Sequence, residues 1–418
     1  MYIKKIILKD IRCFENLKIN FDKNGSSALI VGDNGDGKST LLKSLAIGLC
    51  DESSAAGLHR ELPGEFIRKH SKGKHGIITI ELEDKQNKYK IKTVIQPFKT
   101  FERIRQRVYV NGKESSQKNF PWADIFVCGY GPGRQTSGNA DIEEYTAIDA
   151  VYTLFRYNEP MQNPDLATFK LIEKARSMAG NDSKNKEGHA EKMLSKLSSL
   201  LKKVLNLDER DEVFISYKGI EIKGHWGRHR LSSLADGYQA TVTWVLDFLT
   251  WRLVYNKSLD IEKMSGIVII DEIEQHLHPR WQINIMRLLQ ESFPKIQFIV
   301  STHSPLVASG CEHCKIISLK RGCAKVHKNV YGWLPEDVLR EIMDLAKPRP
   351  NPVDDKINRY GNLYEKRLSN KQLSPSEKQE FLNIRHSLAH QMPEGDPITF
   401  TTKIDVIKNY LKKAKKKS

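Results

Sequence analysis

The feature that most constrains the fold is a glycine-rich run of eight residues, 32–39, which reads GDNGDGKS. It follows an apolar run at 27–32, which predicts a strand, and it precedes helical spacing at 40–49. The run fits the pattern G-x-x-x-x-G-K-[ST], whose glycines let backbone N–H groups turn inward around phosphate oxygens. The following helix N-terminus adds partial positive charge. We therefore expect a strand, a phosphate-binding loop and a helix in this order.

Residue types within the loop predict its ligands. Lys38 is expected to reach the β- and γ-phosphates of ATP, and Ser39 to ligate Mg²⁺. The residues predicted to contact the nucleotide in and after the loop are Asn34, Gly35, Asp36, Gly37, Lys38, Ser39 and Thr40.

A second motif lies at the end of a later apolar run, 267–270, where Asp271 and Glu272 supply two adjacent carboxylates. In open α/β sheets, ligands bind at the carboxyl ends of the strands. We expect Asp271 to hold the Mg²⁺ shell and Glu272 to polarise the attacking water. The alternative is a buried strand with a polar end and no further role.

Two more segments fit the same site. His303 follows a buried-strand run at 298–301 and is predicted to contact the γ-phosphate or the attacking water, beside the catalytic residues Lys38 and Glu272. The segment 233–239 precedes a long apolar helix, and a glycine at a helix start is another anion site. Because it lies far along the chain from the loop, we expect it to serve the nucleotide of a second subunit. Its predicted contact residues are Ser233, Ala235, Asp236 and Gly237.

Composition limits the setting and the partners. The chain has 418 residues and a net charge of +16, which favours nucleic acid, nucleotide phosphates or an acidic protein surface as partners. It has no run of about 18 apolar residues and no signal-peptide pattern at the start, so we expect a cytoplasmic protein without a membrane partner. The six cysteines do not resemble a disulfide framework. The lysine-rich segment 412–417 is interpreted as a solvated helix end or a non-specific grip on phosphate.

The hydrophobic pattern divides the chain into four parts. Residues 1–140 alternate as strands at 2–9, 16–22, 75–83, 86–96 and 105–111, and residues 141–210 form a helical insertion with a polar loop at 179–186. Residues 211–347 return to alternating strands and helices, and 348–418 form a small helical tail for partner docking. The predicted fold is therefore α/β: a parallel sheet around the loop, an antiparallel β subdomain, a short helical insertion and a C-terminal helical domain.

The four motifs in this order resemble the ABC ATPase heads of SMC, RecF and OLD-type proteins over residues 1–335. This resemblance implies that two heads sandwich two ATP molecules in a head-to-tail dimer or a higher even oligomer, and that the segment at 233–237 contacts the γ-phosphate of the partner. The chain departs from the family at Ala235, where the family usually has serine. The missing hydroxyl removes one hydrogen-bond donor, so closure or hydrolysis is expected to be weak or slow.

Finer features narrow the resemblance. The run 272–282, EIEQHLHPRWQ, the segment 130–134, YGPGR, and the segment 331–333, YGW, look like those of OLD-like ATPases. Many such proteins are ATPase subunits of bacterial anti-phage systems. The Septu ATPase, which pairs with an HNH nuclease, is the nearest in layout, and the PARIS ATPase, which pairs with a Toprim nuclease, is next. Arg12 stands where repair-type members place an arginine near the nucleotide; Phe14 is open to adenine stacking or to core packing.

The expected function is thus an ATP-hydrolysing sensor that controls an associated nuclease, because no Toprim metal run follows His303. One alternative is a DNA-repair ATPase that binds DNA without such a partner. Another is a ribonuclease of the HEPN type that uses Arg385 and His390 in the tail, and a docking or dimer helix competes with it there. The cluster Cys311, His313, Cys314 and Cys323 is interpreted as buried thiols rather than zinc ligands.

Overall fold

The computed structural model describes residues 1–21, 26–69, 75–140, 142–178, 183–256, 264–345, 350–369 and 372–392. The chain forms two compact units, Met1–Met343 and Asp344–Ser418, and each is described by itself. No helix among the described residues is long and apolar enough to cross a membrane.

A six-stranded sheet of mainly parallel strands lies in the first unit, with the strand order β17-β16-β3-β15-β14-β8. Five of these strands are parallel and only β17 is antiparallel to its neighbour. Their bounds are β3 Ser27–Val31, β8 Val127–Tyr130, β14 Ser265–Ile270, β15 Lys295–Thr302, β16 Cys314–Lys320 and β17 Cys323–His327. This arrangement confirms the predicted α/β fold, because parallel strands buried on both faces are the continuous apolar runs found in the sequence.

A second, antiparallel sheet has the strand order β2-β1-β4-β5-β6-β7 and confirms the predicted β subdomain. Its strands are β1 Tyr2–Ile11, β2 Phe14–Asn20, β4 Gly76–Glu83, β5 Lys88–Phe98, β6 Phe101–Val110 and β7 Lys113–Ser115. A turn at Asn111 and Gly112 joins β6 to β7, and both residues have positive φ angles, as such turns require.

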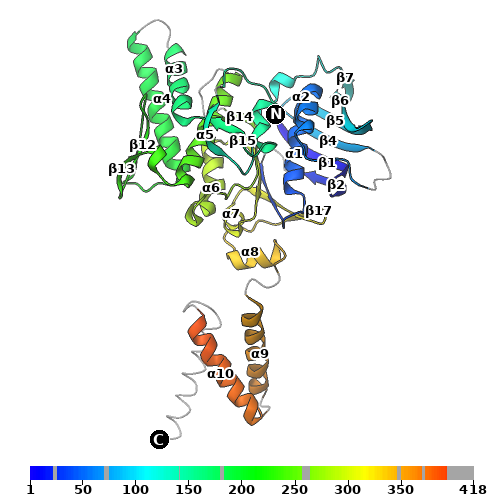
Figure 1. Cartoon of the computed structure of the whole chain (residues 1–418), viewed down its shortest axis with the longest axis vertical. Helices are drawn as coiled ribbons and strands as arrows, with labels where there is room; N and C mark the ends of the chain where they lie inside the picture. Colours follow the sequence, from blue (N-terminus) through cyan, green and yellow to red (C-terminus); the bar gives the residue numbers. More distant parts are fainter. Residues whose placement is uncertain are drawn as a thin grey trace. The chain divides into compact units, whose positions relative to one another are not determined.

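Helix α1 (Lys38–Leu49) and helix α2 (Glu52–Arg60) lie against the antiparallel sheet (Figure 1). One hydrophobic core joins them to residues of both sheets, including Leu45 and Leu58 from the helices, Ile78 from β4 and Ile299 from β15. The phosphate-binding loop is therefore anchored at the start of a helix that is packed on both sheets.

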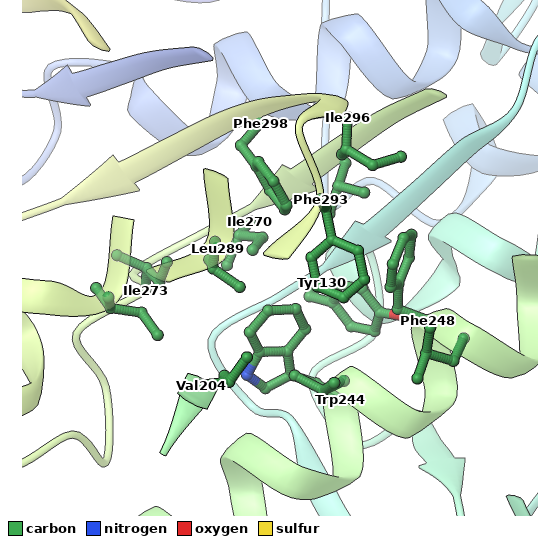
Figure 2. Close-up of a cluster of buried hydrophobic side chains, with 14 of the residues drawn as sticks. Tyr130, Val204, Trp244, Phe248, Ile270, Ile273, Leu289, Phe293, Ile296 and Phe298 are labelled. Carbon is green, nitrogen blue, oxygen red and sulfur yellow. The ribbon is translucent and has the colours of Figure 1, made fainter. Parts of the chain in front are cut away.

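A larger core lies on the other side of the parallel sheet, where α5 (Asp236–Asn256) contributes Trp244 and Phe248 (Figure 2). Five apolar residues of the helical insertion are buried in this core: Met193, Leu197, Leu200, Leu201 and Val204. The elements around it include α3 Pro164–Met178, α4 Ser183–Val204, α6 Pro279–Ser292, β11 Glu212–Ser216, β12 Gly219–Gly224 and β13 Gly227–Arg230. The loop predicted at 179–186 is too long: α4 begins at Ser183, and 179–182 lie outside the described residues.

The remaining elements of the first unit are short. They are η1 Trp122–Asp124, β9 Gln135–Ala140, η2 Asp149–Leu154, β10 Pro160–Gln162, η3 Leu231–Ser233, α7 Pro305–Ser309 and α8 Pro335–Glu341. Cys311 and Cys314 form a disulfide, which corrects the expectation that both are thiols. The two residues are three positions apart and close only a local loop.

The second unit contains helices α9 (Asn351–Leu368) and α10 (Pro375–Gln391). A small core of Tyr360, Leu363, Leu373, Phe381 and Leu388 joins them. Ser374 begins α10 with a capping box, because its hydroxyl accepts the Glu377 N–H while the Glu377 carboxylate accepts the Ser374 N–H. The lysine-rich segment 412–417 lies outside the described residues.

Candidate nucleotide-binding site

The parallel sheet brings the predicted motifs to one edge. Strand β15 lies between β3 and β14, and β8 pairs with the other side of β14. All four strands run in the same direction, so their carboxyl ends are adjacent. The glycine-rich loop follows β3, His303 follows β15, the two carboxylates follow β14, and the segment after Tyr130 follows β8. This edge is where ligands bind in open α/β sheets.

The conformation of the loop depends on Gly37. It precedes α1 with a φ of 97°, a left-handed conformation that glycine adopts without steric cost. A Cβ atom at Gly37 would lie 2.5 Å from the Cys13 sulfur and 2.6 Å from the Phe14 ring, so no larger residue fits. Gly35 has a φ of 88° but open space around it. Cys13 and Phe14, at the turn between β1 and β2, therefore pack against the loop at Gly37.

Lys38 is buried, with 6% of its surface exposed, and its ammonium group donates to the Gly32 carbonyl at 2.9 Å and the Asp33 carbonyl at 3.0 Å. Burial lowers the pKa of Lys38, and the nearby charges of Asp271 and Asp36 oppose this shift. The ammonium group is therefore held at the loop and within electrostatic reach of the carboxylate motif.

Asp36 connects the loop to the turn that follows β16, the strand next to β3. One carboxylate oxygen accepts the Asp33 N–H at 2.9 Å, and the other accepts the Arg321 N–H from the β16–β17 turn at 3.0 Å. Its carboxylate therefore orders the loop, and any contact with a nucleotide falls to its backbone. Asn34, Gly35 and Ser39 are exposed, whereas Thr40 is buried in the first turn of α1.

Ser301 fixes the two carboxylate residues of the second motif. Its hydroxyl donates to an oxygen of the Asp271 carboxylate, and its oxygen accepts the Glu272 N–H at 2.9 Å. Asp271 is 3% exposed, so its orientation is set by this contact within the protein. Glu272 adopts a φ of 51°, an uncommon conformation for a residue with a side chain.

Glu274 was not among the predicted site residues, but it connects the second and third motifs. Its carboxylate accepts the Thr302 hydroxyl at 2.7 Å and the His303 N–H at 2.5 Å. The backbone position of His303 therefore depends on Glu274. No local sequence signal beyond the run of acidic residues indicates this role.

Arg134 is a second site residue that the sequence motifs do not single out, although it lies in the segment 130–134. It is 4% exposed and donates from Nη2 to the carbonyl oxygen of Glu272. Burial lowers its pKa to about 10, against the opposing charges of Glu274, Asp271 and Glu272. Its Nε atom is buried with no hydrogen-bond partner among the described residues. A buried cation therefore faces the carboxylates from the end of β8.

The segment predicted to serve a second subunit begins α5. Ser233, Ala235 and Asp236 are exposed, and Gly237 lies against the His276 carbonyl, where a Cβ atom would come within 2.4 Å. The next ring, Tyr238, packs edge-on against Trp281 at 4.6 Å. Among the described residues, no hydrogen bond, ion pair or ring contact joins this segment to the glycine-rich loop of the same chain.

The Arg12 side chain contacts residues outside the glycine-rich loop. Its guanidinium donates to the Pro63 carbonyl at 2.8 Å and lies over the Phe66 ring at 5.1 Å. Burial lowers its pKa. Phe14 is fully buried, so its ring packs in the core and supports Gly37.

The other predicted chemical groups do not converge. In α10, Arg385 and His390 are five positions apart, which places them about 140° apart around the helix. The His390 ring lies against the ring of His386, with 4.4 Å between the two ring centroids. Across the described residues, no group of three or more His, Cys, Asp or Glu side chains is arranged to hold a metal ion.

A glycine-rich loop with a buried lysine, followed on adjacent strands by an ordered Asp–Glu pair and a polar strand end, defines the class of P-loop nucleotide-binding proteins. Comparisons with known families agree. The chain belongs to the AAA domain family, whose model matches residues 5–221. A second model, described as "AAA domain, putative AbiEii toxin, Type IV TA system", matches residues 233–309.

Two curated proteins are similar to this chain over most of its length. The chain is 28% identical over 320 residues to the Septu protein PtuA of Bacillus mycoides, covering 74% of this chain and 39% of PtuA. It is 26% identical to the Retron Vc95 probable ATPase of Vibrio cholerae, covering 76% of this chain and 73% of the relative. The resemblance to Septu-type ATPases is thereby confirmed. The chain spans about two fifths of the length of that PtuA.

Among solved structures, the SMC head domain from Thermotoga maritima aligns with a TM-score of 0.46 and 15% identity. The alignment covers 78% of this chain and 98% of that domain.

Proposed function

We propose that this protein is an ATP-hydrolysing sensor subunit of an anti-phage defence complex, and that its nucleotide state controls an associated nuclease. The observation that carries the proposal is the ordered cluster at the sheet edge, in which Ser301 holds Asp271 and Glu272 opposite the buried Lys38. The relationship to PtuA and to a retron ATPase supports the setting in phage defence.

Each residue has a proposed part in hydrolysis. Backbone N–H groups of 34–40 and the Lys38 ammonium group bind the phosphates. Ser39 and Asp271 would hold Mg²⁺, which neutralises phosphate charge when bound. The residues fit the ion, since a hydroxyl and a carboxylate are hard oxygen ligands and Ser301 orients that carboxylate. Glu272 polarises the attacking water, and His303 contacts the water or the γ-phosphate.

The segment 233–237 is proposed to act on the nucleotide of a second copy. Ser233, Ala235 and Asp236 are exposed at the start of a buried helix, which leaves the N-terminal end of α5 accessible to another chain. The contact of Gly237 with the His276 carbonyl couples this end to the segment after the carboxylates. A head-to-tail dimer or higher even oligomer would then place each segment on the partner's ATP.

An associated nuclease is proposed from the resemblance of this chain to Septu ATPases. The Septu resemblance favours an HNH nuclease, with a Toprim nuclease as second choice. The helical unit from Asp344 onward is the proposed docking element.

The site is tested with Lys38→Ala in the full chain, with Lys295→Ala as control, because Lys295 is an exposed lysine at the start of β15. The expected result is loss of ATP binding and hydrolysis in the first variant only. Normal binding and hydrolysis by Lys38→Ala would contradict the site.

The partner is tested separately by recovering the tagged chain from its native host, with and without ATP, and identifying co-purified proteins by mass spectrometry. A stoichiometric HNH or Toprim protein supports nuclease control. A homo-oligomer without a nuclease would overturn it and favour a repair ATPase that acts alone.

A further inference from the structure

The outer face of the β5–β6 hairpin carries an unusual row of side chains. In the antiparallel register, Lys90 lies opposite Tyr109, Lys92 opposite Arg107, Val94 opposite Arg105, Gln96 opposite Arg103 and Phe98 opposite Phe101. Residues directly opposite each other in an antiparallel pair share one face. We call these ten residues the hairpin face.

The alternate residues of both strands point the other way, and most of them are buried. Ile91, Ile95, Ile104 and Val108 belong to the core that includes α1 and α2. The two strands lie at the side of the sheet labelled β5 and β6 in Figure 1, with both helices against the sheet. The basic side chains are therefore on the face that this core does not cover.

Positive charge on the hairpin face is concentrated and poorly neutralised. Lys92 and Arg107 are directly opposite each other, an arrangement of like charges that destabilises a strand pair. Neither side chain makes an ion pair or a side-chain hydrogen bond with the described residues. Arg105 is the exception, because it pairs with Glu52 at 3.3 Å, but that contact is exposed and contributes little.

The carboxylates near the hairpin face are already engaged. Glu102 accepts the backbone N–H groups of Phe66 and Ile67 and pairs with His59. Asp51 accepts the N–H groups at the start of α2. Glu81, next along the sheet, pairs with Lys5. These carboxylates therefore do not neutralise the cations of the hairpin face, which are open to pairing with negative charges on another molecule.

Aromatic rings accompany the cations at the end of the hairpin. Phe98 is 39% exposed and Phe101 57% exposed, and their rings contact each other at 5.3 Å. Arg103 lies over the Phe98 ring at 5.6 Å, and Lys90 over the Tyr109 ring at 5.6 Å. Exposed rings beside cations offer apolar faces on which the rings of a ligand can stack.

A hollow adjoins this end of the hairpin. It has a volume of about 800 Å³ and is lined by Phe98, Phe101, Arg103 and Arg105, together with Arg60 and Lys118. Asp51, Glu52 and Glu102 also line it, and each already accepts hydrogen bonds within the chain. The hollow therefore lies between the end of the hairpin and α2, and it combines two exposed rings with four cations and three engaged carboxylates.

We propose that the hairpin face and this hollow bind single-stranded nucleic acid. Arg105, Arg107 and Lys92 contact successive phosphates, and bases stack on Phe98 and Phe101. This combination of a basic track and exposed rings is how proteins bind single strands without reading sequence. A duplex keeps its bases stacked internally and offers no faces to the rings, so a single strand is the better fit. The inference does not rest on the proposed ATP hydrolysis.

The test measures binding of the full chain to a fluorescein-labelled 20-nucleotide oligothymidylate by anisotropy, without ATP, over a range of salt concentrations. The charge variant is Arg105→Ala/Arg107→Ala/Lys92→Ala. Its control, Lys192→Ala/Lys196→Ala/Lys218→Ala, removes the same charge from exposed positions elsewhere. We expect the charge variant to bind at least 10-fold more weakly and its salt slope to fall by about 2, while the control is nearly unchanged.

The ring variant is Phe98→Ala/Phe101→Ala. Its control, Phe169→Ala/Tyr217→Ala, removes another exposed pair of contacting rings, at 6.0 Å. Loss of stacking should weaken binding by about 5- to 150-fold for each base, with the salt slope unchanged. Circular dichroism and melting temperature show that each variant is folded.

Several outcomes would overturn the proposal. One is no binding of the oligonucleotide by the unaltered chain, and another is equal weakening by the charge variant and its control. If duplex of the same length binds as tightly and the ring variant has no effect, the face is not a single-strand site. Binding of polyglutamate but not of oligonucleotide would indicate an acidic protein surface instead. Because the assay contains no ATP, its result is separate from that of the ATP site.

Discussion

The hydroxyl of Ser301 donates a hydrogen bond to the Asp271 carboxylate, and the same oxygen accepts the N–H of Glu272. One side chain on β15 therefore positions both acidic residues at the end of β14. Ser301 and Asp271 are 30 positions apart in the chain and adjacent in the sheet.

Removing this hydroxyl should impair the reaction more than nucleotide binding. In Ser301→Ala, Asp271 loses its orienting donor and the Glu272 N–H loses its acceptor. We expect ATP hydrolysis to fall about 10-fold or more and the Mg²⁺ concentration needed for half-maximal activity to rise. Steady-state hydrolysis at varied Mg²⁺ measures both.

Ser304→Ala is the control, because the Ser304 hydroxyl caps α7 through the Leu306 and Val307 N–H groups. It should cost about 1 kcal/mol of stability without changing the Mg²⁺ dependence. An unchanged Mg²⁺ dependence in Ser301→Ala would show that Asp271 is positioned by other contacts.

ATP hydrolysis should require both the positive charge and the planar shape of the Arg134 guanidinium. Its guanidinium donates to the Glu272 carbonyl and lies among three carboxylates. Arg134→Ala removes one of the two buried positive charges near those carboxylates, the other being Lys38, and should lower hydrolysis by about 10-fold or more. Arg134→Lys keeps the charge but not the planar donor, so only partial recovery is expected. Full activity of Arg134→Ala in a hydrolysis assay would exclude the role.

Two glycines of the loop provide a matched comparison. Gly37→Ala combines a left-handed φ of 97° with a clash against Cys13 and Phe14. Gly35→Ala has a similar φ of 88° but open space around the new methyl group. We expect Gly37→Ala to lose ATP binding and Gly35→Ala to keep a larger part of it. Titration with a fluorescent ATP analogue measures both, and equal losses would mean that backbone conformation alone decides.

The buried carboxyl of Asp247 should make stability depend on pH. Burial raises its pKa from 3.8 to about 6, although the Gln162 N–H and the Tyr130 hydroxyl donate to it. A carboxyl whose folded pKa is raised favours the folded state at low pH. That stability is lost as the pH rises from about 4 to 6, by roughly 3 kcal/mol.

Asp247→Asn is nearly isosteric and does not titrate. Its melting temperature relative to the unaltered chain should therefore rise as the pH increases from 4 to 7. Thermal unfolding monitored by circular dichroism checks this trend. Parallel pH profiles for the two proteins would show that Asp247 does not titrate in this range.

Much of the nucleotide site was accessible from the sequence, since its motifs follow strands that local pattern reveals. The loop at 32–39 has a spacing that few other functions require, and Asp271 and His303 each end an apolar run. Parallel strands place such ends at one sheet edge, so motif order alone predicted their convergence. The roles of these residues in hydrolysis remain predictions.

The contacts that hold the site depended on tertiary structure. Ser301, Glu274 and Arg134 act on partners 28 to 138 positions away, and contacts at such separations leave no periodic signal. Likewise, β5 and β6 each show alternation, but only their register places Lys92 against Arg107 and Phe98 against Phe101. Local sequence pattern indicates which chemical groups end each strand. Only the folded chain shows which strands are neighbours, because pairing depends on the packing of the whole core and not on local pattern.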